Sequence, residues 1–345
     1  MDIFRLIMTA CVVVGLIFIG ALIFDPARGQ DLTAWIRSEL QGRTNSADLT
    51  QRVEAALSRN DYDEAAMYAD IAEFTGIPLA PEVQARFSEQ SNGVRARATG
   101  TDGFIDASAQ DAPTNTSALA GAVASDLTMI GDLRDIGEQG ARMRDGRPYD
   151  QLLIELSVVG LALTSQFSVS AAPALPAKVG VSVLKAADRA DTLSPDFLEY
   201  LRPRFEKAVD LKALGTALQG VNLEDAIATR AAVEDIAAHT HTAAVFTTLT
   251  RIEAVRNAAG AGEAVRLLAY VRGSDDLEAL VRLTQLLGPK TRGVIELTGA
   301  TSPHLFKHFP NLVPLVVENI GSLIAWGVSL LAIFLSRRVF SFASA

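Results

Sequence analysis

The sequence LIMTACVVVGLIFIGALIF, residues 6–24, is an apolar run without a charged side chain. A second run, IGSLIAWGVSLLAIFL at residues 320–335, lies near the other end of the chain. At about 1.5 Å per residue the first run forms a helix of roughly 28 Å, which is long enough to cross a bilayer core. The second run reaches a similar length only when the residues before it, Glu318 among them, are included. The two runs predict transmembrane helices at residues 6–24 and 312–335.

The first run is interpreted as a signal anchor that stays attached to the protein. A cleavable signal has an apolar core of about 7 to 15 residues and a small-x-small cleavage site, whereas this chain continues after Phe24 as DPAR. Cleavage after the run is the alternative. Cys11 lies inside the run and is the only cysteine of the chain, so no intramolecular disulfide can form.

Basic residues next to the runs predict their orientation. Arg337 and Arg338 directly follow the second run in a short tail, and short basic tails stay in the cytoplasm. The first run has Arg5 before it and Arg28 after it, so its own flanks favour neither direction. We expect two spans in the inner membrane of a bacterium, with both termini in the cytoplasm and residues 25–311 in the periplasm.

The charge of the chain limits its partners. The formal net charge is −9 at pH 7. Because Arg337 and Arg338 contribute +2 while Asp2 and Arg5 cancel, the part between the runs carries −11. Negative charge repels the phosphate groups of nucleic acids and of anionic lipids. We therefore expect no nucleic-acid partner; the expected partners are the bilayer and other envelope proteins or a second copy of this chain.

Between the runs, apolar residues recur at intervals of three and four, which predicts an all-α fold. Residues 48–75 are expected to form two helices joined by a turn at Asn60-Asp61. Four residues, Tyr62, Ala65, Ala72 and Pro78, are spaced as in one tetratricopeptide unit, which this segment therefore resembles. A solenoid needs several such units to bury its face, and the sequence holds no second one, so a simple helical hairpin is preferred.

A change of composition divides the part between the runs. Residues 90–116 are rich in Ser, Thr, Asn, Gly and Asp and poor in large apolar groups, which predicts a polar linker. It separates a small hairpin region from a main helical domain that is long enough to bury a core. The predicted division is as follows: cytoplasmic tail 1–5, transmembrane helix 6–24, hairpin region 25–89, linker 90–116, main domain 117–299, juxtamembrane segment 300–311, transmembrane helix 312–335 and cytoplasmic tail 336–345.

Several helix ends are predicted within the main domain. Ser194 directly precedes a proline, which is typical of an N-cap followed by proline at the first helical position. Asn222 is expected to cap another helix in the same way. The GSD sequence at residues 273–275 is expected to separate two amphipathic helices, residues 262–271 and 276–287.

The most unusual internal stretch is an apolar centre within residues 118–187. It is strongly apolar at residues 152–172, is interrupted by Pro173 and Pro176, and ends in a second apolar piece at residues 179–187, which predicts two helices with a break between them. This central hairpin is expected to be the buried centre of the main domain. The alternative is that it enters or crosses the membrane, although a permanent third span would place the basic C-terminal tail on the wrong side.

His304 and His308 are candidate metal ligands. They are four residues apart, so a helix would place both imidazoles on one face at a spacing that can hold a metal. The glutamate of a zinc-protease motif is absent, and the neighbouring Phe306 and Phe309 favour an interfacial anchoring helix instead.

His239 and His241 form a second histidine pair. They are two residues apart and would diverge on a helix, which leaves Asp235 with His239 as a conceivable ligand pair. The sequence contains no Cys/His cluster, no phosphate-cradling loop and no aspartate-rich calcium loop. We therefore expect neither a metal nor a cofactor.

Ser182 and Lys185 match the Ser-x-x-Lys motif of penicillin-recognising hydrolases, in which the lysine can accept the serine proton. The companion Lys-Thr-Gly and Ser-x-Asn sequences are absent, and so short a match arises readily by chance. Catalysis is therefore not expected. A cleft that gathers Glu155 with Ser182, Lys185 or a histidine would favour an enzyme.

Small residues within both runs predict a helix-packing stripe, which lets another membrane helix approach closely. They recur at intervals of four: Gly321, Ala325 and Ser329 in the second run, Cys11 and Gly15 in the first. Chance alignment on a lipid-facing side is the alternative. Glu318 at the membrane boundary is an ionisable residue with a functional interpretation, but it lies close enough to the boundary to reach water by snorkelling, which is preferred.

Three functions are compatible with this layout. The preferred one is a non-catalytic, membrane-anchored envelope protein whose helical periplasmic domain binds or positions protein partners. The first alternative is a membrane-perturbing or transport-accessory protein that uses the apolar hairpin at residues 152–187. The second alternative is a hydrolase without a recognisable motif.

Overall fold

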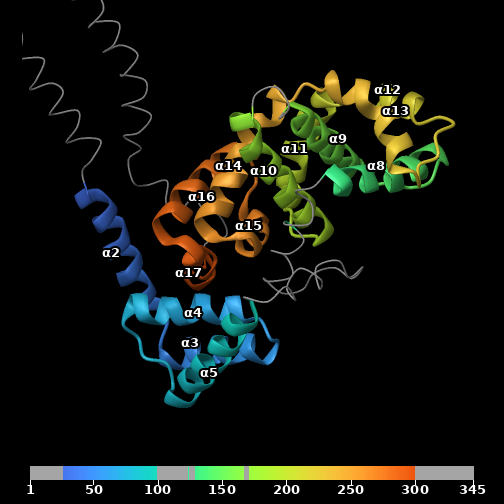
Figure 1. Cartoon of the computed structure of the whole chain (residues 1–345). Coiled ribbons are helices and arrows are strands. Elements are labelled where there is room, and N and C mark those ends of the chain that lie inside the picture. The colour runs from blue at the N-terminus through green and yellow to red at the C-terminus, as the bar shows by residue number, and fades with distance from the viewer. Residues whose placement is uncertain (1–25, 99–122, 124–128, 167–170, 300–345) are drawn as a thin grey trace, which may run out of the picture. The chain divides into compact units, whose positions relative to one another are not determined.

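The chain was analysed in a computed structural model (Figure 1), which describes these residues: 26–98, 123, 129–166 and 171–299. Within these ranges the chain forms helices and no β-strand, which confirms the predicted all-α fold. The predicted membrane helices lie outside the described residues and stay predictions. Within the described ranges, no helix combines the length and the apolar character that a bilayer crossing requires.

The helices are numbered in chain order, and most are separated by short turns. Their bounds are α2 (Pro26–Arg43), α3 (Ser46–Ser58), α4 (Tyr62–Thr75), α5 (Pro81–Ala98), α8 (Met129–Arg144), α9 (Gln151–Gln166), α10 (Ala171–Arg189), α11 (Pro195–Ala208), α12 (Leu211–Ala217), α13 (Ala226–Ala238), α14 (Ala243–Ala259), α15 (Ala261–Leu267), the 3₁₀ turn η2 (Leu268–Tyr270), α16 (Ser274–Leu287), the 3₁₀ turn η3 (Gly288–Lys290) and α17 (Thr291–Thr298). The described residues from Ile36 onward form one compact unit, while α2 up to Trp35 belongs to a second unit.

Helices α3 and α4 form the predicted hairpin with its turn at Asn60-Asp61. Asn60 has a φ of 57°, a left-handed conformation that asparagine tolerates better than most residues. The side chain of Asp61 then caps α4 by accepting a hydrogen bond from the backbone N–H of Glu64 at 3.1 Å. Helix α5 contacts both members of the hairpin. It continues to Ala98 and so includes the first residues of the predicted linker.

The predicted central hairpin lies in the interior of the compact unit. Its helices α9 and α10 pack on each other, and α8, α13 and α14 pack around them. Along α9 the side chains of Ile154, Leu156, Val158, Val159 and Leu163 are fully buried. Since these side chains leave no apolar face of α9 open, the expectation of a buried centre is confirmed.

The break in this hairpin does not lie at the two prolines, where it was predicted. Helix α10 begins at Ala171, so Pro173 lies in its first turn and Pro176 one turn later. A proline lacks the backbone N–H, but the N–H groups of a first turn have no partner within the helix in any case. Pro173 is therefore compatible with a helix start rather than with a break.

A second prediction also shifts along the chain. Asn222 does not cap a helix; its side chain accepts a hydrogen bond from the N–H of Glu224 in a short turn. The cap of α13 is Asp225, whose carboxylate accepts from the N–H groups of Ile227 and Ala228. Asn and Asp both favour N-cap positions, so the conformation of the turn determines that Asp225 and not Asn222 caps α13. The predicted cap at Ser194 is confirmed by its bond from the N–H of Phe197 at 3.1 Å.

Helices α10 and α14 cross at very short range. A Cβ atom at Gly180 would lie 2.1 Å from the backbone oxygen of Leu249, so only glycine fits at this crossing. Helix α14 in turn packs against α15 and α16. The close crossing connects the central hairpin to the C-terminal helices.

Polar contacts join the N-terminal hairpin to the C-terminal helices. Arg266 on α15 binds Asp61 at 2.6 Å and Glu64 at 2.8 Å. On α17, Glu296 accepts a hydrogen bond from the hydroxyl of Tyr68. At Gly293 a Cβ atom would meet the side chain of Ile71, so α17 lies directly on α4. We call this contact region the α4–α17 seam.

Candidate functional site

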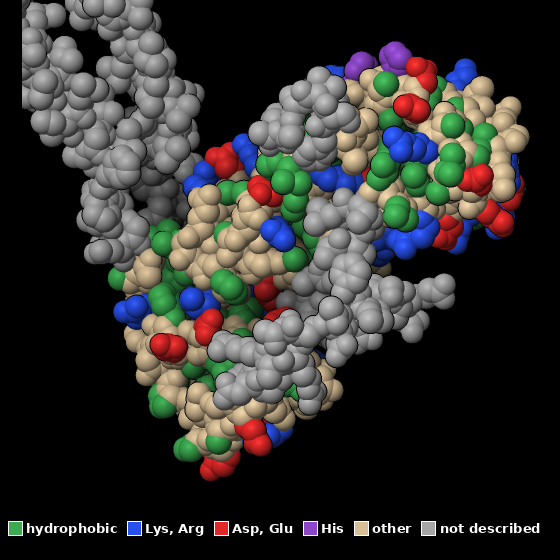
Figure 2. All heavy atoms as spheres, viewed as in Figure 1, with side chains coloured by type: hydrophobic (Ala, Val, Ile, Leu, Met, Phe, Trp, Pro, Cys, Tyr) green, Lys and Arg blue, Asp and Glu red, His purple; other side chains and the backbone are tan. Residues whose placement is uncertain are grey.

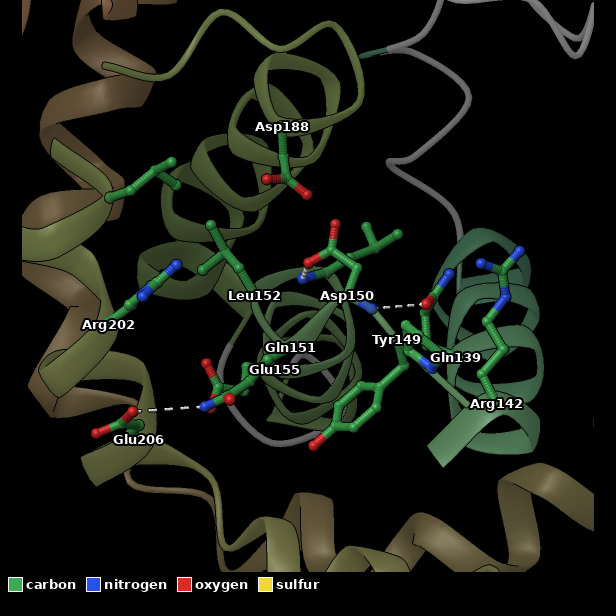
Figure 3. A pocket seen from close by; sticks show the side chains of 13 residues that line it. Gln139, Arg142, Tyr149, Asp150, Gln151, Leu152, Glu155, Asp188, Arg202 and Glu206 are labelled. Atoms are coloured by element: carbon green, nitrogen blue, oxygen red, sulfur yellow. Dashed lines mark hydrogen bonds between the residues drawn. The ribbon is translucent and has the colours of Figure 1, made fainter. Parts of the chain in front are cut away.

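A pocket of about 740 Å³ lies between α8, the start of α9, the end of α10 and α11 (Figure 3). We call it the carboxylate pocket because four acidic side chains line it, together with arginine, glutamine, tyrosine and leucine. Its lining residues are Gln139, Arg142, Pro148, Tyr149, Asp150, Gln151, Leu152, Leu153, Glu155, Asp188, Leu198, Arg202 and Glu206.

The start of α9 builds the floor of the carboxylate pocket. The carboxylate of Asp150 accepts a hydrogen bond from the N–H of Leu153 at 3.0 Å, which is an N-cap interaction for α9. The backbone N–H of Asp150 donates to the side chain of Gln139 on α8 at 2.9 Å, and Figure 3 shows this bond. The turn before α9 is thereby tied to α8 on one side and to its own helix on the other.

Glu155 follows one turn later on α9 and is only 1% exposed. Its carboxylate accepts a hydrogen bond from the side-chain amide of Gln151 at 3.0 Å, and the same amide lies 3.5 Å from Glu206 on α11. Burial raises the pKa of Glu155 to about 7, and the nearby negative charge of Glu206 adds to the shift, while the Gln151 bond and Arg202 act in the opposite direction. This carboxyl group is thus about half protonated at neutral pH.

Asp188 faces Asp150 across the carboxylate pocket from the last turn of α10 (Figure 3). Its Oδ2 atom is buried and has no hydrogen-bond partner. Burial raises the pKa of Asp188 to about 8, and the neighbouring charge of Asp150 raises it further, against a lowering effect of Arg189. Of the ion pairs formed among the described residues, none includes Asp188 or Glu155. The carboxylates of Asp132 and Asp135, by contrast, do form ion pairs.

A buried ion-pair network lies between α8 and α10. Asp132 binds Lys178 and, at 3.1 Å, Lys185. Asp135 binds Lys185 at 2.5 Å and Arg189 at 2.6 Å. The two lysines and Asp132 are at most 2% exposed. Burial raises the pKa of Asp132, although Lys185 and Lys178 both counteract it.

A glycine on α9 makes room for this network. A Cβ atom at Gly160 would lie 2.7 Å from the carboxylate of Asp132, so a larger residue would push the carboxylate away from its lysines. The ion-pair network therefore depends on three helices: α8 carries the acids, α10 carries the bases and α9 leaves the space between them.

The Ser-x-x-Lys match is part of the ion-pair network. The hydroxyl of Ser182 donates to the backbone oxygen of Lys178 at 3.3 Å, while the amine of Lys185 contacts Asp132 and Asp135 instead of the hydroxyl. Ser182 and Lys185 are both fully buried. This geometry provides no base beside the serine and no access for a substrate.

His239 and His241 line a second hollow, which shares Gln151 and Glu206 with the carboxylate pocket. A ring nitrogen of His239 lies 2.8 Å from the backbone oxygen of Asp235 and 3.4 Å from its carboxylate, and both side chains are exposed. Within the described ranges, no group of three His, Cys, Asp or Glu side chains is arranged to hold a metal ion.

The remaining sequence candidates lie outside the described residues. They are the histidines and the glutamate near the second run, and the small residues of both runs: His304, His308, Glu318, Gly321, Ala325, Ser329, Cys11 and Gly15. Their predicted roles stay predictions.

Sequence reasoning missed most of the carboxylate pocket. Asp150 precedes α9, Asp188 lies in the last turn of α10, and Arg202 and Glu206 lie four residues apart on α11, so no local spacing connects the three groups. The ion-pair network did leave a signal. Lys178 and Lys185 are seven residues apart on one face of an otherwise apolar helix, and buried lysines require partners.

No protein-family model matches this chain, and comparisons with curated proteins and with solved structures also found no match. In the carboxylate pocket, burial raises the pKa of both Glu155 and Asp188, and neither carboxyl forms an ion pair with a described residue.

Proposed function

We propose that this protein is a non-catalytic envelope protein, held in the inner membrane by both terminal apolar runs, whose helical periplasmic domain binds or positions protein partners. One observation supports it best. Arg37 and Gln41 on α2 and Lys290 just before α17 line one common hollow. The first residues of the compact unit therefore lie beside the element that directly precedes its last described helix, and this arrangement is compatible with attachment of both runs to one membrane.

The surface of the described residues also fits a protein that works by contact. Figure 2 shows acidic and basic side chains mixed over the visible face, without an extended area of one sign. Within the described ranges, the most exposed large apolar side chains are Ile227, Ile130 and Leu175, which lie on different helices. Contacts through such a surface depend on shape and on polar groups more than on a single apolar area.

The ion-pair network disfavours the alternative of a membrane-entering hairpin. Helix α10 would carry Lys178 and Lys185 into the bilayer, while Asp132 and Asp135 would stay on α8 without these partners. Each charge that is moved unpaired into hydrocarbon costs several kcal/mol. The same lysines therefore favour a hairpin that stays within the folded unit.

Reporter fusions test the proposed topology. Alkaline phosphatase fused after residue 90 or residue 190 is expected to be active, because it folds only outside the cytoplasm. Green fluorescent protein fused after residue 345 is expected to fluoresce, because it folds only in the cytoplasm. An inactive phosphatase at residue 190, together with fluorescence of green fluorescent protein fused at the same position, would place the helical unit in the cytoplasm and refute the proposal.

Cross-linking in native membranes tests the proposed role. A photoreactive residue at the exposed position Ile227 on α13 is expected to give a reproducible adduct with an envelope protein or a second copy of this chain, identified by mass spectrometry. The same residue at the buried position Val233 is the negative control. If no exposed position of the described helices yields a protein adduct, the role in binding partners is wrong.

A leakage assay distinguishes the membrane-perturbing alternative. Full-length protein reconstituted in liposomes of phosphatidylethanolamine and phosphatidylglycerol is expected to retain a trapped dye. Leakage that the change Val159→Asp on α9 abolishes would favour the alternative over the proposal.

A further inference from the structure

Two kinds of buried carboxyl group occur in the four-helix region around α9. In the ion-pair network, Asp132 and Asp135 each contact cationic side chains. In the carboxylate pocket, Glu155 is buried and the half-buried Asp188 has a buried Oδ2 atom without a hydrogen-bond partner; neither carboxyl forms an ion pair with a described residue. A buried carboxylate without a cation is costly, whereas the same group is tolerated when it is protonated.

We propose that the carboxylate pocket is a proton-responsive switch, in which release of protons from Glu155 and Asp188 loosens the junction of α9, α10 and α11 and uptake of protons tightens it. This inference goes beyond the proposed function, because it concerns the state of the pocket and not the partner. It does not depend on the predicted membrane topology.

Geometry makes these two groups act on the junction. Glu155 belongs to the first turns of α9, Asp188 to the last turn of α10, and Leu198 and Glu206 line the same pocket from α11. When it is charged, Asp188 is repelled by Asp150 at the start of α9. Glu155 is likewise repelled by Glu206 on α11. Water reaches the charges through the existing space of about 740 Å³, so it is the mutual repulsion of the carboxylates that pushes these helix ends apart.

The charged groups that face the two carboxyls come from every lining element. Helix α8 contributes Arg142, the turn before α9 contributes Tyr149 and Asp150, and α11 contributes Arg202 and Glu206. Next to Asp188, Arg189 and Asp191 act with opposite signs. Helices α13, α14 and α15 also pack against α9 or α10 but contribute none of the lining residues.

The direction of the pH effect follows from the folded pKa values of about 7 for Glu155 and about 8 for Asp188, against 4.5 and 3.8 for the same groups in water. Between these limits the folded protein holds protons that the unfolded chain has released. The free energy of unfolding therefore falls as the pH rises through this window and recovers on mild acidification. A carboxylate in an ordinary ion pair has a folded pKa below its value in water. Its titration makes the free energy of unfolding rise with pH, which is the opposite slope.

Thermal unfolding of the full-length protein in detergent tests the switch. For the wild type, Tm is expected to fall from pH 5.5 to pH 8.5. The double variant E155Q/D188N is expected to have a higher Tm than the wild type at pH 8 and a clearly shallower profile, because its amides stay neutral while Asp132 and Glu263 still titrate with a raised pKa. The single variants E155Q and D188N are each expected to remove part of the slope, so either one suffices if the other fails to fold.

Two control variants separate the switch from other titrations. E234Q removes an exposed carboxylate on α13 and is expected to keep the wild-type slope. H239Q/H241Q removes the two histidines of the adjoining hollow and is also expected to keep it. A wild-type slope in E155Q/D188N, or a lower Tm of that variant than of the wild type at pH 8, would overturn the proposal.

Hydrogen exchange tests the loosening itself. After correction for the chemical exchange rate, amides of residues 151–155 and 198–206 are expected to open more often at pH 8 than at pH 6. For each carboxyl the opening rises by up to about tenfold per pH unit between its pKa in water and its folded pKa, and it levels off above the folded pKa. The amides of α16 are expected to show no such change. Equal opening at both pH values would refute the loosening of the junction.

Discussion

At the scale of single residues, the unusual feature is the number of charged side chains in the interior. Asp132 contacts both Lys178 and Lys185, and Asp135 contacts Lys185 and Arg189. The exposed Arg134 lies 3.6 Å from Asp135. Because Asp132 holds two buried lysines, whereas the loss of Lys178 leaves Asp132 bound to Lys185, removing the acid and removing the base should have unequal effects.

The first prediction compares these two changes. Asp132→Asn takes a carboxylate away from two buried lysines and is expected to lower the free energy of unfolding by about 3 to 5 kcal/mol, as for other broken buried ion pairs. Lys178→Met leaves Asp132 bound to Lys185 and replaces the lysine by an apolar side chain of similar volume. It is expected to cost less than about 1.5 kcal/mol. Urea unfolding of both variants measures the difference, and equal losses would contradict it.

At the scale of elements, the helices depend on a few local devices. Ser194 accepts a hydrogen bond from the N–H of Phe197, and its hydroxyl also donates to the backbone oxygen of Val271. Thr242 occupies the same cap position in α14 but makes no side-chain cap bond. The two caps look alike in sequence and differ in the bonds that they form.

The second prediction uses this pair of caps. Ser194→Ala is expected to cost about 1 to 2 kcal/mol, because it removes the cap of α11 and a bond to the segment after η2. Thr242→Ala is expected to cost less than about 0.5 kcal/mol, because no cap bond is lost. Chemical denaturation at one pH measures both values. A loss at Thr242 as large as that at Ser194 would contradict the distinction.

The third prediction concerns the crossing of α10 and α14. Gly180→Ala places a methyl group 2.1 Å from the backbone oxygen of Leu249 and is expected to cost about 3 kcal/mol or more, because backbone cannot move aside cheaply. Gly215→Ala in α12 meets the side chain of Met143 only at 3.7 Å. It is expected to stabilise the protein by about 0.5 kcal/mol, because alanine favours helix over glycine. The two Tm shifts should therefore have opposite signs.

At the scale of the whole molecule, the α4–α17 seam decides whether the N-terminal hairpin and the C-terminal helices behave as one body. The residues that it joins are about 200 positions apart in sequence: Asp61 and Glu64 with Arg266 are separated by 205 and 202. Arg292 on α17 adds a contact with Glu64 at 3.9 Å and is itself held by Glu263 and Glu296, each at 2.8 Å. These arginines are mostly shielded from water, so screening by salt weakens their bonds only slightly.

The fourth prediction tests the α4–α17 seam. Arg266→Gln removes the bonds to Asp61 and Glu64 and is expected to raise the hydrogen exchange of residues 46–75 by at least tenfold, while α9 keeps its protection. Arg282→Gln on α16 removes a half-exposed pair with Glu278 and is the matched control, with no expected change in residues 46–75. An equal effect of both changes would show that the seam does not hold the hairpin.

The sequence by itself determined the local features of this protein: the helical class, the hairpin with its turn at Asn60-Asp61 and the cap at Ser194. Such features depend on periodicity and on side chains within about four residues of each other, so they can be read along the chain. The start of α10 and the cap of α13 were misplaced, because several neighbouring residues satisfied the same local rule.

Only the tertiary structure decided the ion-pair network, the carboxylate pocket and the α4–α17 seam. Asp132 and Lys178 are 46 positions apart, and Gln151 and Glu206 are 55 positions apart, so no local pattern couples them. Whether such groups meet depends on which helices pack together and at what angle. Burial then sets their charge, because the cost of removing a carboxylate from water is determined by the protein around it and not by its neighbours in sequence.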